Sequence, residues 1–279
     1  MVTKITLMGA GGKMGGRILD NIKDDPAFEV SCVEVGKAGI RNLEIRGISP
    51  VPESDALGVA DAVVLALPDR LIGNVSKSMI PQLKGGALVI SLDPAAAYAG
   101  VIPIREDIAY FVCHPCHPPL FELAENKEEQ LDWFGGVAAK QSVVCALHRG
   151  EEDDYQRGEA IAAAMFQPIL RMHRITVEQM AILEPAIVET TTASLLYACK
   201  EAMEQGIKMG IPKEAARDFV LGHLRVELAI IFDVAGFPFS DGAMQAIKAA
   251  QSKLLKDDWK EQISNLDNIR RSVRSITGD

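Results

Sequence analysis

The first sixteen residues restrict the fold of this chain more than any other segment. A β-branched, alternating run through Val2, Ile5 and Leu7 stops at the glycine cluster Gly9-Ala-Gly-Gly-Lys-Met-Gly15, and a helix-like run begins at Arg17. A strand, a glycine turn and a helix in this order form a site for dinucleotide phosphates, because the helix presents the positive end of its dipole to them. The segment therefore predicts a Rossmann-like nucleotide-binding domain.

The glycines of this loop have separate expected roles. Gly9 allows the tight turn, and Gly15 lets the helix pack close to the strand. Gly11 and Gly12 leave room for backbone N–H groups to approach a pyrophosphate. The alternative is a glycine-rich turn that binds nothing. The residues expected to contact a dinucleotide here are Gly9, Gly11, Gly12, Lys13, Met14 and Gly15.

A second strand-like run, residues 28–34, ends in the acid Glu34. An acid at this place accepts hydrogen bonds from the adenosine ribose hydroxyls and repels a 2′-phosphate, which favours NAD over NADP. The alternative is a surface glutamate. Pro68 and Asp69 follow the strand-like run that starts at residue 61, and we expect both to lie near the nicotinamide end of the cofactor.

Apolar runs separated by helix-like segments continue through the first half of the chain, at residues 61–68, 87–93, 108–114 and 142–147. They predict an α/β fold with a Rossmann-like, doubly wound parallel sheet. Ligands then bind beyond the carboxyl ends of the strands, where Asp93 also falls.

Helical periodicity replaces the strands from Thr176 onward, where Thr176 and Gln179 form a potential capping box. We therefore predict an NAD-binding Rossmann-like domain at residues 1–175. An all-α domain for substrate binding and dimerisation is predicted at residues 176–279.

The composition limits the partners of the chain. Its formal net charge of −9 argues against nucleic acids and anionic membranes as partners. No apolar run reaches the ~18 residues of a membrane span, and no signal-like segment starts the sequence. The five cysteines indicate reduced thiols rather than a disulfide framework, so we expect a cytoplasmic protein.

The densest group of chemically active side chains is Cys113-His-Pro-Cys-His-Pro-Pro119, at the end of an expected strand. A structural zinc site needs four ligands, usually from two paired clusters, and this sequence has no second pair. The sequence agrees better with a metal held by one or two residues of this loop and a carboxylate from elsewhere. Such a metal would keep positions open for substrate. The alternative is a rigid turn with packed imidazoles.

Two further candidates carry charge. Glu184 lies among apolar residues before Pro185, and an acid directed inward there is paired, protonated or metal-bound. Glu189 lies five residues on, so in an α-helix the two glutamates do not share one face. Lys140 is a candidate general acid or anion contact, and solvent exposure is the alternative for it and for Glu184. The hydroxyls of Thr190–Thr192 either contact a polyol or pack on a helix face.

The Gly9–Gly15 loop, the Ala66-Leu-Pro-Asp69 turn and the all-α second half resemble the 3-hydroxyacid/6-phosphogluconate dehydrogenase superfamily. Three longer and more specific strings, at residues 110–119, 134–141 and 177–185, are similar to those of the D-apionate oxidoisomerase family within it. This resemblance implies NAD-linked oxidation coupled to an acyloin-type rearrangement of a branched sugar acid.

The same resemblance implies a divalent metal, zinc or magnesium/manganese, on the matching His114 and Glu184. In the wider superfamily a catalytic lysine lies early in the first long helix of the second domain, near the place of Glu184. A carboxylate cannot polarise a carbonyl as an ammonium group does, but a carboxylate-bound cation can. His114 and Glu184 are thus expected to serve catalysis through the metal, with His117 or Lys140 relaying the proton.

The sequence therefore predicts an NAD-dependent, metal-assisted oxidoisomerase acting on a small sugar acid. The apolar C-terminal helices, including residues 228–232, suggest a homodimer, although they would also suit a domain core. One alternative is a metal-free NAD-dependent 3-hydroxyacid dehydrogenase, decarboxylating or not. A second, of another class, is a non-catalytic NAD(H)-binding sensor on the same fold.

Overall fold

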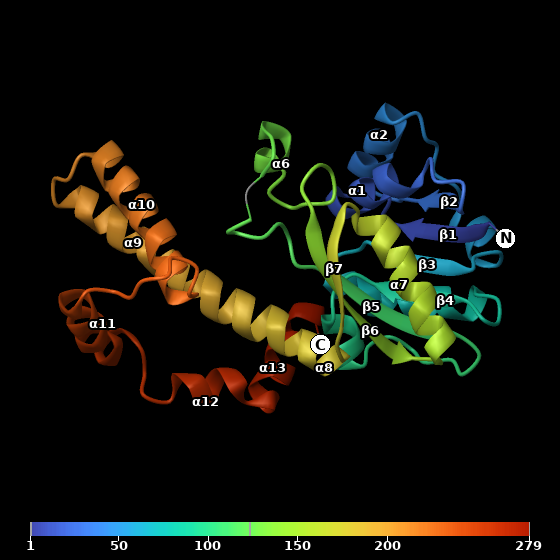
Figure 1. Cartoon of the computed structure of the whole chain (residues 1–279). Coiled ribbons are helices and arrows are strands. Elements are labelled where there is room, and N and C mark those ends of the chain that lie inside the picture. Colours follow the sequence, from blue (N-terminus) through green and yellow to red (C-terminus); the bar gives the residue numbers. More distant parts are fainter. Residues whose placement is uncertain (1, 123, 279) are drawn as a thin grey trace. The chain divides into compact units, whose positions relative to one another are not determined.

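A seven-stranded sheet with the strand order β2-β1-β3-β4-β5-β6-β7 organises the first part of the chain (Figure 1). The computed structural model describes residues 2–122 and 124–278. The strands are β1 (Thr3–Met8), β2 (Phe28–Val33), β3 (Ala62–Leu65), β4 (Leu88–Ser91), β5 (Ala109–Pro115), β6 (Gln141–Arg149) and β7 (Ile169–Arg174).

Helices connect the strands and form the rest of the chain. Those up to residue 181 are α1 (Lys13–Ile22), α2 (Lys37–Ile45), α3 (Glu53–Leu57), α4 (Asp69–Met79), η1 (Ile80–Gln82), α5 (Ala95–Ala99), α6 (Lys127–Leu131), α7 (Glu152–Phe166) and α8 (Val177–Ala181). The remainder are η2 (Ile182–Ala193), α9 (Ser194–Lys208), α10 (Lys213–Ile231), α11 (Asp241–Leu254), α12 (Trp259–Ser264) and α13 (Leu266–Thr277).

The chain divides into two units, Met1–Ala181 with Arg270–Asp279, and Ile182–Ile269. The domain boundary predicted after residue 175 lies six residues before the end of the first unit at Ala181. The prediction also placed residues 270–279 in the second domain rather than in the first. Part of the reason is local: Arg270 Nη2 lies 4.0 Å from Glu178 Oε2 in α8, within the first unit. No helix among the described residues is long and apolar enough to cross a membrane.

Alternate residues of the central strands face two separate apolar layers. Ile5 and Leu7 of β1 pack in the layer covered by α1 and α7, whereas Met8 packs in the opposite layer with α4 and α5. Strands β3 and β4 are buried along their whole length. Continuous apolar runs are expected in such strands because helices cover both faces of the sheet. The doubly wound Rossmann-like fold predicted from the sequence is confirmed.

The sheet is not parallel throughout, and this part of the prediction was wrong. Strand β6 pairs antiparallel with β5, with Pro115 opposite Val143, and β7 runs parallel to β6. The N–H of Cys116 also donates to the carbonyl oxygen of Ser142 at 2.8 Å. Because β6 runs backwards, its first residues lie at the edge where β1 to β5 end. The loop that precedes β6 is thereby brought to the ligand-binding edge.

The predicted capping box at the start of α8 is present. The Thr176 N–H donates to Gln179 Oε1 at 2.9 Å, and the Gln179 N–H donates to Thr176 Oγ1 at 3.1 Å. Helical structure then continues to residue 208, as the periodicity predicts.

The segment η2 is a π-helix, which the sequence pattern did not predict. Pro185 lies inside it and has no N–H to donate, so the regular α-helical pattern is interrupted where the sequence indicated. The hydroxyls of Thr190, Thr191 and Thr192 donate to the carbonyl oxygens five residues earlier, at 2.5, 2.8 and 3.1 Å. Their protons therefore serve the helix itself.

Candidate active site

Two glycines of the loop after β1 are required by close backbone contacts. Gly9 has a φ of +74°, and a Cβ at this position would lie 2.4 Å from the carbonyl oxygen of Ala66. A Cβ at Gly15 would lie 2.2 Å from the carbonyl oxygen of Gly9. These are the tight turn and the close helix packing that the two positions were expected to provide.

Gly11 has a structural role that differs from the expected one. Its N–H donates to Glu34 Oε2 at 3.0 Å, and its carbonyl oxygen accepts a hydrogen bond from Asn42 Nδ2 at 2.8 Å. A Cβ at Gly11 would lie 2.0 Å from the carbonyl oxygen of Gly39. The absence of a side chain therefore allows α2 to approach the loop. Neither Gly39 nor Asn42 was singled out from the sequence, because only the folded turn brings α2 to Gly11.

The N–H groups positioned for a phosphate are those of the first helical turn. The Gly12 N–H already donates to the carbonyl oxygen of Gly9 at 3.0 Å. Gly12 is the N-cap residue of α1, so Lys13 and Met14 start the helix. Donors in this turn have no acceptor within the helix and point toward the positive end of its dipole. The chemistry of this turn therefore suits an anion, as expected for a dinucleotide phosphate.

Glu34 is held in place at the carboxyl end of β2. Its Oε1 accepts hydrogen bonds from the N–H groups of Val35 and Gly36, at 3.0 and 2.8 Å, and its Oε2 accepts that of Gly11. The side chain is half-buried, and these three hydrogen bonds come from neutral backbone groups. The Glu34 carboxylate thus lies beside the glycine loop, where the acid was expected.

Three titratable residues lie at or just after the carboxyl ends of β3, β4 and β5 in turn. They are Asp69 at the start of α4, Asp93, and His114, whose Nδ1 lies 3.9 Å from Asp93 Oδ2. Burial, and then the charge of Asp93, raise the pKa of Asp69 to about 6. Pro68 beside it is exposed and is the N-cap residue of α4. The expected ligand-binding edge of the sheet therefore carries closely spaced ionisable groups.

His114 is oriented by a backbone carbonyl. Its Nδ1 lies 2.8 Å from the carbonyl oxygen of Leu92. A carbonyl oxygen only accepts, so Nδ1 carries a proton. Metal-binding histidines usually have one ring nitrogen anchored in this way, which orients the ring. The donor chemistry of His114 therefore fits the predicted metal.

His117 is anchored in the same way. Its Nδ1 lies 3.0 Å from the carbonyl oxygen of Phe134, so its Nε2 presents a lone pair. The rings of His114 and His117 lie 6.4 Å apart, edge to face. The backbone of His117 has a φ of +62°, a left-handed conformation that costs about 1–2 kcal/mol in a residue with a Cβ. Such conformations are kept where the surrounding structure fixes them, often at functional sites.

The other predicted catalytic residues lie in different parts of the chain. Lys140 is exposed and immediately precedes β6, so it lies at the same edge of the sheet as the end of β5. Glu184 is half-buried in η2, which belongs to the second unit. Among residues 2–122 and 124–278, no three His, Cys, Asp or Glu side chains converge as a metal site.

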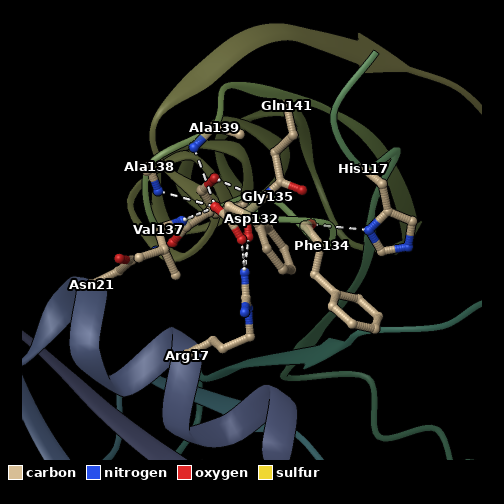
Figure 2. Close-up of polar contacts among 12 residues, drawn as sticks. Arg17, Asn21, His117, Asp132, Phe134, Gly135, Val137, Ala138, Ala139 and Gln141 are labelled. Atoms are coloured by element: carbon tan, nitrogen blue, oxygen red, sulfur yellow. Dashed lines mark hydrogen bonds and ion pairs between the residues drawn. The ribbon is translucent and has the colours of Figure 1, made fainter. Parts of the chain in front are cut away.

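A loop between α6 and β6 is attached to α1 by polar contacts (Figure 2). Arg17 Nη2 lies 2.7 Å from Asp132 Oδ1 and also donates to the carbonyl oxygen of Gly135. Asn21 Nδ2 donates to the carbonyl oxygen of Gly136 at 2.9 Å. These contacts could not be predicted from the sequence, because Arg17 and Asp132 are 115 residues apart and neither belongs to a recognisable motif.

Comparison with known proteins identifies the family of this chain. Residues 123–277 match the family model described as phosphogluconate dehydrogenase (decarboxylating) C-term. A D-apionate oxidoisomerase of Cupriavidus necator is 45% identical over 99% of this chain and 100% of its own length. That of Rhizobium rhizogenes is 44% identical over the same shares. The chain belongs to the D-apionate oxidoisomerase family.

Solved structures support the family assignment. A Cupriavidus necator structure, described as a semialdehyde dehydrogenase NAD-binding protein in complex with calcium and NAD, is 45% identical with a TM-score of 0.95. The match covers 99% of this chain and 100% of that one. An NADH-preferring ketol-acid reductoisomerase from an uncultured archaean has a TM-score of 0.70 at 17% identity over 99% of this chain and 82% of its own. This second likeness shows the shared fold alone.

Proposed function

We propose that this chain is an NAD-dependent oxidoisomerase that converts D-apionate, or a closely similar branched sugar acid, by oxidation coupled to rearrangement. The observation that carries the proposal is His114, whose Nδ1 is anchored by the Leu92 carbonyl oxygen at the sheet edge served by the glycine loop. The near full-length similarity of the chain to D-apionate oxidoisomerases supplies the substrate class. We place this reaction in the cytoplasm, as expected from the sequence.

The glycine loop and Glu34 would hold NAD. Phosphates would meet the first turn of α1 at Lys13 and Met14, and Glu34 would accept hydrogen bonds from the adenosine ribose. Pro68 and Asp69, which follow β3, would lie toward the nicotinamide. The bound dinucleotide supplies the hydride acceptor for oxidation of the carbinol carbon. NAD in the similar Cupriavidus necator structure supports this assignment.

His114 and Glu184 would hold a divalent metal. An imidazole nitrogen and a carboxylate suit zinc or manganese better than calcium, although the similar Cupriavidus necator structure contains calcium. When bound, the metal supplies Lewis acidity that polarises a carbonyl and lowers the pKa of a coordinated hydroxyl. The Leu92 carbonyl keeps His114 in the tautomer that can bind it.

The chain's own side chains would manage protons around the substrate. His117 and Lys140 both lie at the edge of the sheet where β5 ends and β6 begins. Oxidation releases the hydroxyl proton, and rearrangement of the carbonyl requires protons to be returned, so an acid and a base are both needed. His117 with its available Nε2 suits the base, and the exposed Lys140 suits the acid or a contact to the substrate carboxylate.

The first test measures NADH production with D-apionate and a panel of 3-hydroxy acids, with and without EDTA. Chelator-sensitive turnover of D-apionate, restored by Mg²⁺, Mn²⁺, Zn²⁺ or Ca²⁺, is the expected result. Chelator-insensitive turnover of a simple 3-hydroxy acid would instead establish the metal-free dehydrogenase. Tight NADH binding without turnover of any of these acids would favour a non-catalytic NAD(H) sensor.

We also propose that the protein is a homodimer formed through its second unit. Helix α9 has no buried residue and α10 buries only Ala216. Large apolar side chains are exposed there, among them Tyr197 at 66%, Phe219 at 67% and Phe232 at 65%. Helices of this kind gain most of their stability from apolar packing, and clustered exposed apolar residues are typical of association sites.

Light scattering coupled to size-exclusion chromatography tests the dimer. The wild type should elute with twice the mass of the chain, and Phe219→Glu should shift it toward the monomer. Ile104→Glu, which introduces the same charge at an exposed apolar site in the first unit, is the matched control and should stay dimeric. A monomeric wild type would refute the proposal.

A further inference from the structure

His117 follows β5 in the sequence, but its side chain is held by the loop that precedes β6. Its Nδ1–H donates to the Phe134 carbonyl oxygen, and its ring packs edge to face against the Phe134 ring at 5.6 Å between centroids. The left-handed backbone of His117 directs the side chain toward this loop (Figure 2). The position of Nε2 therefore depends on the position of Phe134.

Phe134 is in turn fixed by the residues around it. Asp132 Oδ2 accepts hydrogen bonds from the N–H groups of Val137, Ala138 and Ala139, at 3.0, 3.0 and 3.2 Å, which closes the loop on itself. The other oxygen of Asp132, Oδ1, accepts a hydrogen bond from Arg17 Nη2 of α1 (Figure 2). One carboxylate thus shapes the loop and attaches it to the helix.

The Arg17–Asp132 ion pair is well shielded from solvent. The Asp132 side chain is 7% exposed and that of Arg17 is 25% exposed. Burial alone would raise the pKa of Asp132, but the Arg17 hydrogen bond and the backbone N–H groups outweigh it and hold the pKa below its usual value. A pair in these surroundings is less screened by water than an exposed one, so losing either partner leaves the other charge poorly solvated.

Cations also lie against the Phe134 ring. Lys13 Nζ lies 3.5 Å from the ring centroid, and the Arg17 guanidinium carbon lies 5.7 Å from it. Both residues belong to α1, whose first turn has the chemistry that suits an anion. The helix that would bind the dinucleotide phosphates is thereby connected to the loop that fixes His117.

We propose that His117 is a catalytic residue that accepts the substrate hydroxyl proton at Nε2, and that Arg17 and Asp132 are positioning residues that hold it there. The inference rests on the proposed function for its reaction. When the carbinol is oxidised, its O–H bond breaks and the proton goes to His117 Nε2. The carbinol C–H bond breaks at the same time, and the hydride, with its electron pair, goes to NAD⁺. A carbonyl remains on the substrate.

Four variants separate a catalytic role from a purely structural one. His117→Asn removes the base, and asparagine tolerates the left-handed conformation, so the backbone is kept. Asp132→Asn and Arg17→Met each remove one partner of the ion pair. Asp20→Asn is the matched control, because it removes another acidic group of α1 that pairs with Arg46 and Lys23 rather than with a residue of the loop.

Turnover and NADH binding are measured for each variant. His117→Asn should lower kcat at least about 100-fold, the usual range for loss of a general base, with the Kd for NADH within twofold of wild type. Asp132→Asn and Arg17→Met should each lower kcat about tenfold. The double variant should have a kcat no lower than the poorer single variant, because both substitutions break the same ion pair. Asp20→Asn should match the wild type.

Side-chain nitrogen NMR provides a readout that does not require the substrate. The chain has five histidines, so single substitutions assign their signals. In the wild type the His117 signal should show a protonated Nδ1 and a bare Nε2, and this signature should be lost or mixed in Asp132→Asn but kept in Asp20→Asn.

The two arms distinguish failure of the inference from failure of the proposed function. If the wild type does not turn over D-apionate, the proposed function fails, and the NMR arm still decides whether Asp132 positions His117. If His117→Asn retains kcat within twofold of the wild type, His117 is not the base. If Asp132→Asn leaves both kcat and the His117 signal unchanged, the positioning role is refuted.

Discussion

The carboxylate of Glu34 accepts the backbone N–H of Gly11 at 3.0 Å, across 23 residues of sequence. This contact fixes the end of β2 against the turn that follows β1. In the proposed function, this carboxylate meets the ribose of the bound dinucleotide and repels a 2′-phosphate. We therefore expect cofactor preference to depend on a side chain that also holds the glycine loop in shape.

Glu34→Gln should weaken the preference for NAD. The neutral amide keeps a similar shape but removes the charge, so kcat/KM for NAD should fall about tenfold, corresponding to about 1.4 kcal/mol. The value for NADP should rise, because the repulsion is gone. Steady-state kinetics with both cofactors measure the ratio. Glu29→Gln, at an exposed position on the same strand, should leave it unchanged, and an unchanged ratio in Glu34→Gln would contradict the assignment.

Gly39→Ala should act on the cofactor site through Glu34. A Cβ at Gly39 would lie 2.3 Å from the carboxyl carbon of Glu34, so the carboxylate must move away from Gly11. The KM for NAD should rise about tenfold, which corresponds to the loss of one charge-assisted hydrogen bond. Gly58→Ala is the control, because its added methyl group would have no neighbour closer than 3.9 Å. Equal KM values for the two variants would show that the Gly39 contact does not matter.

Glu184→Gln should separate cofactor binding from turnover. The glycine loop lies in the first unit, so fluorescence titration should give a Kd for NADH within twofold of the wild type. Loss of the carboxylate should remove a metal ligand and lower kcat at least about 100-fold, because the Lewis acid is lost. Glu204→Gln removes an exposed glutamate of α9 that pairs with Lys200 and should keep full activity. Normal turnover by Glu184→Gln would rule out its role as a metal ligand.

Asp69 should make the protein less stable as the pH rises. Its pKa is about 6 in the fold and about 3.9 in an unfolded chain, so the folded state favours the protonated carboxyl. The destabilisation is absent below pH 4, develops between about pH 4 and 6, and is complete above pH 6. Asp69→Asn should therefore raise the Tm at pH 7.5 and leave it nearly unchanged at pH 4. Differential scanning calorimetry at both values measures this, and an equal Tm shift at both would contradict the raised pKa.

The sequence predicted the parts of the structure that depend on local pattern. The β1–turn–α1 unit, the buried strands β3 and β4 and the capping box at Thr176 all follow from residues close together in the chain. Pattern could not reveal the reversed direction of β6, because an apolar strand has the same residues whichever way it runs. The Arg17–Asp132 pair was missed for a related reason, since only the folded sheet brings α1 beside a loop 115 residues away.

For the candidate site too, the sequence predicted which residues take part but not the contacts that only the fold creates. His114 and His117 were recognisable from their composition, but their anchored tautomers depend on the carbonyl groups of Leu92 and Phe134, and every residue type carries a carbonyl. The prediction that Glu184 and Glu189 do not share one face holds for an α-helix. In η2 the hydrogen bonds span five residues rather than four, so residues five apart come closer to one face than in an α-helix.

The π-helix makes this part of the chain sensitive to its length more than to its composition. Deleting one residue between Ala186 and Thr192 would change both the number of residues and the rotation per residue in this segment, and so the angle around the helix axis at which Glu184 lies relative to α9. Substitutions at exposed positions of the same segment leave that angle intact. Over evolutionary time, η2 should therefore accept exchanges of residue type while insertions and deletions are eliminated.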